Sequence, residues 1–251
     1  MKIFPKSSQF FALLLIFFGG AFVSADPEIS VVHGHPVDPN DPVAKVTVGV
    51  YGHELGMETV CTGTLIAEDL AVTAGHCKGT ADELRLGLDL KGNHVIRIPI
   101  VAKATTFSWW GFQNDITLLY FKGGIPQGYA KADILPMNHL LVKGEKLLIA
   151  GFGETKNNQG DYGKLRAAPN FIGEPTNKKG EVVLEAIDGA GACHGDSGGP
   201  AFITYDQHLY FFGVDSRSGF WGTCGHREIY TDVRAHLEWI GKMAAKFRSA
   251  G

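Results

Sequence analysis

The sequence predicts an all-β protein that ends in a helix, and three observations lead to this fold class. Several short stretches alternate apolar with other residues, as half-buried strands do. Glycine makes up 33 of the 251 residues, about 13% and nearly twice its usual share, which indicates many tight turns between short strands. The last segment differs from the rest, because its apolar residues recur at helical spacing.

The predicted strands follow one another without helices between them. Two stretches alternate at every second position, with valine in 46–50 and isoleucine in 96–100. The remaining candidates are apolar runs, most of them bounded by Gly or Asp: 147–150, 182–187, 201–205 and 209–214. Regular short strands with turn signals favour a sandwich or a barrel.

The terminal helix is predicted to begin after Asp232, whose side chain suits an N-cap. Val233, Leu237, Ile240 and Ala244 then fall at helical spacing. Residues 31–251 contain no repeat, linker or low-complexity stretch, so we expect them to form one architectural unit.

The composition excludes several classes of protein. Apolar residues make up 45% of the chain and charged residues 20%, which is the balance of a globular protein rather than a disordered one. The formal charge is −3, so the chain lacks the basic surface that nucleic-acid binding requires, and we expect no nucleic-acid partner.

Residues 1–25 have the three-part build of a secretory signal peptide. Lys2 and Lys6 give a positive start, an apolar run follows, and Val23-Ser24-Ala25 offers small residues for cleavage. The alternative is a membrane anchor, but the run from Phe10 to Val23 has only fourteen residues, and a spanning helix needs about 20. We therefore expect a secreted or periplasmic protein that leaves the membrane once the signal is removed.

Four cysteines lie beyond the signal peptide: Cys61, Cys77, Cys193 and Cys224. An exported chain meets an oxidising compartment, so an even number of cysteines indicates disulfides. No Cys-x-x-Cys spacing is present, which argues against a zinc ribbon. Three pairings remain open on this reasoning alone.

Three local motifs carry the chemistry: TAGHC at 73–77, NDI at 114–116 and GDSGGP at 195–200. With these motifs in this order, the chain resembles the chymotrypsin-like (trypsin-fold) serine endopeptidases over essentially all of 31–251. The resemblance implies two packed six-stranded antiparallel β-barrels with the active site between them. It also implies catalysis without a metal or other cofactor.

The resemblance assigns a role to each residue of the site. Ser197 would be the nucleophile, with His76 as its general base and Asp115 holding the imidazole in the correct tautomer. A serine hydroxyl needs such a base, because almost none of it is ionised at neutral pH. The backbone N–H groups of Gly195 and Ser197 would form the oxyanion hole. Ser216 matches the family serine that donates a hydrogen bond to the catalytic aspartate.

The cysteines and the mature N-terminus also follow from the resemblance. Its members pair the cysteines that correspond to Cys61–Cys77 and Cys193–Cys224. They also bury a new α-ammonium group, here that of Val31, against the aspartate before the nucleophile, here Asp196. We therefore expect 26–30 to be a short propeptide and the protein to be made as a zymogen. The alternative is that signal peptidase alone makes the working terminus.

The specificity pocket departs from the family pattern. Trypsin-like members carry an aspartate six residues before the nucleophile, where this chain has Gly191, followed by Ala192. Glu228 aligns with a pocket-wall position that is usually Gly, and a carboxylate there can attract a basic side chain. The opposing interpretation is that Glu228 pairs with a nearby arginine and fills the pocket, which favours small or apolar residues. Ser216 is on the wall, and Ser218, where Gly is usual, narrows the mouth.

Several of these residues also fit other interpretations. The spacing Gly-x-Ser-x-Gly at 195–199 also fits the nucleophile elbow of α/β-hydrolases, but that fold needs alternating strands and helices. His33 and His35 suggest a metal, yet no third ligand is evident nearby. His194 at the pocket rim either touches substrate or stays solvated. The tryptophans at 109–110 are expected to pack a surface loop.

These observations together predict a secreted serine endopeptidase that acts as a monomer on protein or peptide substrates, with an activating protease as a further partner. The second hypothesis is a relative that has lost catalysis and serves as a binding or adhesion module. Such relatives usually lose one of the three catalytic residues, and here all three positions are filled.

Overall fold

The computed structural model describes residues 31–250 except 55, 109–112, 157 and 220–223. The predicted signal peptide, the predicted propeptide and the tryptophan pair at 109–110 lie outside the described residues. Within the described part, no helix is both long enough and apolar enough to cross a bilayer.

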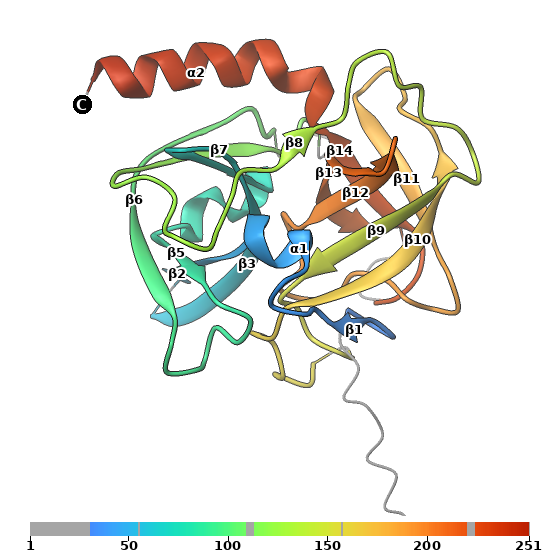
Figure 1. The fold of residues 1–251 in the computed structure, drawn as a ribbon, viewed down its shortest axis with the longest axis horizontal. Helices are drawn as coiled ribbons and strands as arrows, with labels where there is room; N and C mark the ends of the chain where they lie inside the picture. The colour runs from blue at the N-terminus through green and yellow to red at the C-terminus, as the bar shows by residue number, and fades with distance from the viewer. Residues whose placement is uncertain (1–30, 55, 109–112, 157, 220–223, 251) are drawn as a thin grey trace, which may run out of the picture.

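Two closed antiparallel β-barrels lie side by side, as expected (Figure 1). Six strands close the first barrel, in the order β2-β3-β4-β7-β6-β5. Their bounds are β2 Thr47–Glu54, β3 Met57–Ala67, β4 Leu70–Thr73, β7 Thr117–Phe121, β6 Ile96–Thr105 and β5 Glu83–Leu86.

The second barrel is built from the C-terminal half of the chain, in the order β10-β11-β14-β13-β12-β9. Pairing of β9 with β10 closes it. Its strands are β9 Lys146–Gly151, β10 Arg166–Glu174, β11 Glu181–Ala186, β12 Pro200–Tyr205, β13 His208–Ser218 and β14 Glu228–Asp232. Two short strands attach to this barrel: β1 (His35–Pro36) pairs with β10 and β8 (Asp133–Ile134) with β13.

The predicted strand at 46–50 begins one residue later than expected. Val46 ends the short helix α1 (Pro42–Val46) instead. Asp41 caps this helix by accepting a hydrogen bond from Val43 N, and Pro42 supplies a preformed φ angle at the first helical position. A second difference concerns the isoleucines that alternate in the predicted strand at 96–100. Ile98 is buried in the first barrel, whereas Ile96 is exposed.

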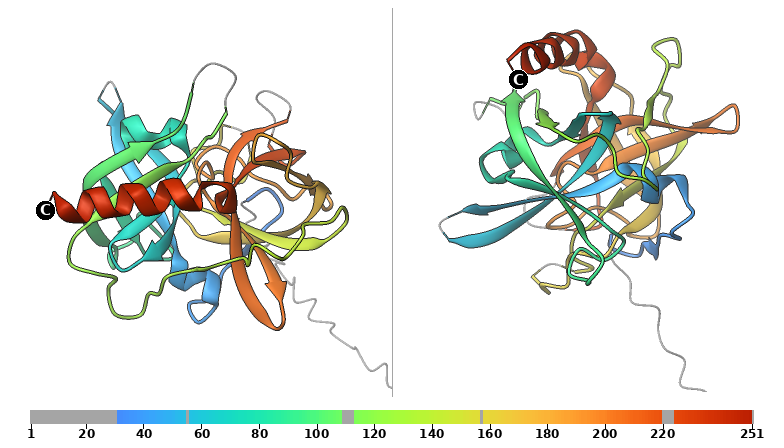
Figure 2. Two further views of the ribbon diagram at one scale, coloured as in Figure 1. Left: turned by 90° about the horizontal axis from the view of Figure 1, so that it is seen from above. Right: turned by 60° about the vertical axis from the view of Figure 1, so that its left-hand side comes forward.

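The C-terminal helix begins later than predicted. Asp232 caps a 3-10 helix, η2 (Val233–His236), and the α-helix α2 runs from Leu237 to Ser249. As Figure 2 shows, α2 leaves the second barrel and lies over the first. Ile240 and Ala244 are its buried residues.

Side chains between the barrels form a core of their own. Each barrel has a buried cluster inside it. A third cluster joins Leu118 of the first barrel, Phe202 of the second and Ile240 of α2. The loops at the junction of the barrels are therefore held on a packed base.

Two disulfides brace the loops near this junction. Cys61 of β3 is bonded to Cys77 of the 3-10 helix η1 (Gly75–Thr80). Cys193 is bonded to Cys224, which ties the loop before Ser197 to the segment that leads into β14. Both pairings are those that the family resemblance implies.

Candidate active site

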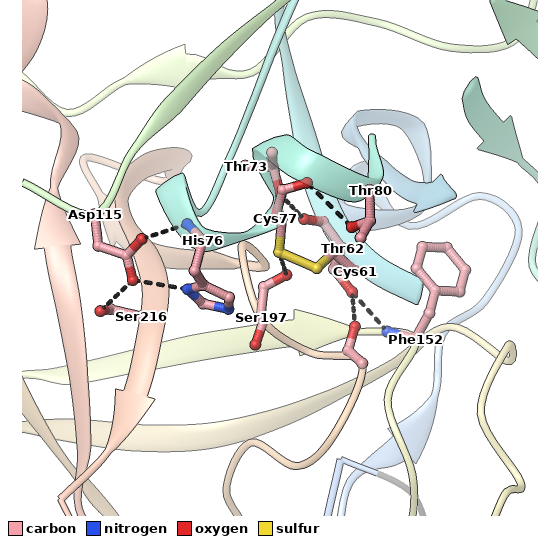
Figure 3. The surroundings of a disulfide bond; sticks show 11 residues. Cys61, Thr62, Thr73, His76, Cys77, Thr80, Asp115, Phe152, Ser197 and Ser216 are labelled. Carbon is pink, nitrogen blue, oxygen red and sulfur yellow. Dashed lines mark hydrogen bonds and ion pairs between the residues drawn. A yellow bond between two sulfur atoms is a disulfide. The ribbon is translucent and has the colours of Figure 1, made fainter. Parts of the chain in front are cut away.

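One hydrogen-bonded chain at the junction of the barrels links two of the predicted catalytic residues, His76 and Asp115, with Ser216 (Figure 3). His76 Nδ1 donates to Asp115 Oδ2 at 2.9 Å, and His76 N donates to Asp115 Oδ1 at the same distance. Ser216 Oγ donates to Asp115 Oδ2 at 2.6 Å. The Asp115 side chain is 1% exposed and that of His76 27% exposed. A buried carboxylate thus fixes the ring and its Nδ1–H tautomer, which leaves Nε2 to act as a base.

Local backbone geometry holds Asp115 in this position. Asn114 has a φ of +54°, and its carbonyl accepts a hydrogen bond from Ile116 N. Thr231 Oγ1, from the second barrel, donates to Asp115 O at 3.2 Å. A Cβ at Gly75 would lie 2.9 Å from Asp115 Oδ1, so only glycine allows the carboxylate this close to the turn before His76.

Ser197 lies on the far side of the His76 imidazole from Asp115 (Figure 3). Its carbonyl accepts a hydrogen bond from Thr62 N at 2.8 Å. Gly198, the next residue, has a φ of +84°, and a Cβ there would lie 2.4 Å from Thr62 O. A side chain at 198 is therefore excluded twice, by the left-handed backbone and by contact with the first barrel.

The loop before Ser197 orients the backbone of the predicted oxyanion hole. His194 O accepts a hydrogen bond from Glu154 N at 2.8 Å. In a planar trans peptide the carbonyl and the following N–H point in opposite directions, so the Gly195 N–H points away from Glu154. Gly195 has a φ of +98°, which its lack of a side chain permits.

Asp196 is buried beneath the loop, with 2% of its surface exposed. Its Oδ1 accepts from Gly153 N at 2.7 Å and its Oδ2 from Cys193 N at 2.9 Å. Burial raises the pKa of Asp196 to about 7, against the lowering effect of these two donors and of Arg166. Val31 is buried in the core of the same barrel.

The residues predicted to line a specificity pocket flank the Cys193–Cys224 disulfide. Gly191 and Ala192 are buried, and Gly191 N donates to Val32 O at 3.1 Å. A Cβ at Gly191 would lie 2.8 Å from Gly225 Cα, so this position carries no side chain for a steric reason. Ser218 of β13 is half-buried and pairs in register with Glu228 of β14.

Glu228 is a buried carboxyl group that forms no salt bridge with any described residue. It is 2% exposed, and its Oε1 has no hydrogen-bond partner among the described residues. Burial raises its pKa to about 10, and the nearby charges of Asp215 and Asp196 raise it further. Asp215 is 4% exposed and its Oδ1 also lacks a partner; burial is likewise the largest cause of its raised pKa.

The two nearby arginines, Arg217 and Arg227, which the opposing interpretation would pair with Glu228, bind other acids. Arg217 Nη2 donates to Glu181 Oε1 at 2.6 Å. Arg227 pairs with Glu174 and, through Nε, with Glu185 Oε1 at 3.6 Å.

One group of described residues has the geometry to hold a metal ion, namely Cys61, His76 and Cys77. The two cysteines form a disulfide, so they have no thiolates to offer. His33, one of the two histidines noted in the sequence, donates from Nδ1 to Asp188 O at 2.7 Å. His194 is exposed.

Sequence reasoning missed two residues of this region. Asp215 directly follows the apolar strand predicted at 209–214. Its only unusual feature in the sequence is that an acidic residue stands next to an apolar stretch. Thr62 lies inside β3, where threonine is common in strands. The structure places its hydroxyl between two backbone groups of the second barrel, at 2.8 Å from Gly195 O and 3.1 Å from Phe152 N.

Two antiparallel barrels with a His–Asp pair and a serine at their junction define the class of chymotrypsin-like serine proteases. Comparison with known families agrees with this class. The family model Trypsin matches residues 31–240, and the chain therefore belongs to the trypsin family.

Three curated relatives illustrate the likeness. Human kallikrein-8 (Homo sapiens) is 25% identical over 266 residues, which cover 95% of this chain and 96% of the relative. Anionic trypsin of Canis lupus familiaris is 26% identical over 251 residues, with 91% and 95% covered. The CLIP domain-containing serine protease C9 of Anopheles gambiae is 25% identical over 262 residues, with 90% and 72% covered. These relatives suggest a peptidase that acts on proteins or peptides.

Proposed function

We propose that this protein is a secreted serine endopeptidase in which Ser197, His76 and Asp115 act as a catalytic triad. The observation that carries the proposal is the hydrogen-bonded chain from Ser216 through Asp115 to His76, with Ser197 beyond the ring. The Nδ1–H bond to a buried carboxylate leaves the imidazole ready to accept a proton on its other side.

The proposed reaction proceeds in two stages. His76 takes the hydroxyl proton as Ser197 Oγ attacks the scissile carbonyl carbon, and it returns that proton to the leaving amine. Water, activated by His76, then hydrolyses the acyl-enzyme and releases Ser197. Asp115 stays ionised and stabilises the imidazolium in both stages. The Gly195 and Ser197 N–H groups bind the oxyanion of each tetrahedral intermediate.

We propose that the substrate residue before the scissile bond is basic and that Glu228 binds it. Support comes from the buried Oε1, which has no partner in the described part of the chain. A buried carboxylate needs a cation to pair with, so a basic side chain that reaches Glu228 would stabilise its ionised form. The pocket we propose is lined by Gly191, Ala192, Ser216 and Ser218. The competing candidate is a protonated Glu228 that only fills space and leaves a preference for small or apolar residues.

We further propose that residues 1–25 are a signal peptide, that 26–30 are a propeptide and that 31–251 form the protease domain, which acts as a monomer. Cleavage before Val31 would free an α-ammonium group to pair with Asp196. The burial of Val31 and of Asp196 supports this pairing. Ser30 precedes the cleavage site, so the activating protease should not be specific for basic residues. A fully active protein that begins at Asp26 would contradict this activation scheme.

The proposal is tested by assaying protein that begins at Val31 on a panel of peptides that differ in the residue before the scissile bond. We expect cleavage, and a Ser197→Ala variant should lose about 10⁶-fold in kcat because the triad acts as a unit. Absence of cleavage of every peptide, with both disulfides formed, would instead favour the catalytically silent binding or adhesion module.

A further inference from the structure

Thr62 of β3 connects the first barrel to the loop that carries Ser197, and its N–H, hydroxyl and carbonyl are all hydrogen-bonded. Its N–H donates to Ser197 O at 2.8 Å, and its hydroxyl donates to Gly195 O at 2.8 Å. The same hydroxyl accepts from Phe152 N at 3.1 Å, and Thr62 O accepts from Thr73 Oγ1 at 2.7 Å. Figure 3 shows these groups around the Cys61–Cys77 disulfide.

The direction of the Thr62 hydroxyl is fixed by its two neighbours. A hydroxyl has a single proton to donate, and Phe152 N–H can only donate. The proton must therefore point at Gly195 O. Thr62 is fully buried, so no water competes for either bond, and a buried bond of this kind is costly to leave unmade.

The two carbonyls that Thr62 holds belong to Gly195 and Ser197, the same two residues whose N–H groups make up the proposed oxyanion hole. Gly195 has a φ of +98° and no side chain, so its peptide planes have more freedom than those of any other residue type. On one side of Gly195, the Glu154 N–H binds the carbonyl of His194. On the other side, the Thr62 hydroxyl binds the carbonyl of Gly195 itself. The orientation of the Gly195 N–H is set between these two anchors.

We propose that Thr62 is a positioning residue for the oxyanion hole: its hydroxyl orients the Gly195 carbonyl and thereby the donors that face the substrate. This proposal rests on the proposed endopeptidase function. Thr62 does not touch the reacting atoms. It acts from the first barrel on a loop of the second, so it also makes the alignment of the hole depend on how the two barrels are joined.

The test compares three variants in protein that begins at Val31. Thr62→Val keeps the shape and removes the hydroxyl, whereas Thr62→Ser keeps the hydroxyl. Thr64→Val is the matched control, because Thr64 lies two residues on along the same strand and is buried, with no partner for its Oγ1 in the described part of the chain. Each kcat is referred to the concentration of reactive Ser197, titrated with a phosphonofluoridate.

We expect Thr62→Val to lower kcat by about 10- to 100-fold, which is less than the 10²–10³-fold typical of losing one oxyanion donor outright. KM should change by less than about threefold, because the hole binds the transition state rather than the ground state. A peptide aldehyde, whose adduct carries the oxyanion, should bind more weakly by the same factor as kcat falls. Thr62→Ser should restore kcat, and Thr64→Val should leave it unchanged.

Two results would overturn the positioning role while the enzyme remains active: a Thr62→Val kcat no lower than that of Thr64→Val, or a Thr62→Ser variant as impaired as Thr62→Val. If Thr62→Val does not fold, Thr62→Ala removes the same hydroxyl without placing a methyl group against the carbonyl. A lack of cleavage by the unsubstituted protein contradicts the endopeptidase function itself, and the positioning role with it.

Discussion

At the scale of single residues, the charge of Glu228 decides which substrates the proposed pocket accepts. With a pKa of about 10 before substrate binds, this carboxyl group is protonated at neutral pH. An arginine side chain stays charged throughout the accessible pH range. Next to Glu228 it therefore favours the ionised form of that carboxyl group. Binding such a substrate therefore requires Glu228 to lose its proton, and this cost falls as the pH rises toward 10.

We expect the preference for arginine over an uncharged residue before the scissile bond to increase with pH. The ratio of kcat/KM for two peptides that differ only in that residue is the measurement, because any effect of pH that the two peptides share cancels in the ratio. Below the pKa of Glu228 the ratio should rise by up to about tenfold per pH unit.

The control is Glu228→Gln, which has the same shape but no titrating group. Its ratio should be low and independent of pH. A rising ratio in this variant, or a flat one in the unsubstituted protein, would contradict the role of Glu228 in binding a basic residue.

Some residues of the site could be predicted from the sequence and others could not. His76, Asp115 and Ser197 lie in short motifs, and the structure brings them together at the junction of the barrels. Asp215 and Thr62 gave no such signal, because their importance comes from neighbours far along the chain. Thr62 contacts Gly195, 133 positions away, and local patterns contain no information on such a pair.

At the scale of the elements, α2 shows what periodicity predicts and what it does not. The spacing of apolar residues predicted a helix after Asp232, and it is present. The turn that follows Asp232 is the 3-10 helix η2, however, as is common at the N-terminus of an α-helix, and Asp232 caps it by accepting from Arg234 N. Nor did periodicity predict that α2 crosses to the first barrel, where Phe247 stacks on Tyr120 with ring centroids 5.7 Å apart.

We expect Ile240→Ala in α2 to lower the free energy of unfolding by about 2–4 kcal/mol, because it leaves a cavity in the core between the barrels. Urea unfolding of the Ser197→Ala protein, which cannot digest itself under the proposed mechanism, gives this value. Lys242→Ala, on the exposed face of the same helix, is the control and should cost at most about 0.5 kcal/mol through its pair with Glu238. Equal costs for the two variants would mean that α2 does not help to hold the barrels together.

At the scale of the whole molecule, the barrel count could not be read from periodicity, which indicates only many short strands. Closure depends on pairing between distant strands, such as β9 with β10 and β2 with β5. The family resemblance supplied that count. The chain termini also matter at this scale, because the proposed activation moves a charge from solvent into the second barrel.

That movement makes the stability of the precursor and of the mature protein depend differently on pH. In the folded protein the pKa of Asp196 is raised from 3.8 to about 7. The folded state therefore keeps a proton that the unfolded chain releases, and the corresponding stability is present below pH 4 and lost as the pH rises through 7. An α-ammonium group beside Asp196 would favour the ionised carboxylate and so remove most of this loss of stability. The effect would last until the α-ammonium group itself loses its proton near pH 8.

We therefore expect protein that begins at Asp26 to lose a few kcal/mol more than protein that begins at Val31 when the pH rises from 4 to 7. Both are made with Ser197→Ala and unfolded in urea at each pH. Asp196→Asn should abolish the difference, since it removes the group that titrates. If the two proteins lose stability in parallel while Asp196 is intact, the Val31 ammonium does not reach Asp196 and activation needs another explanation.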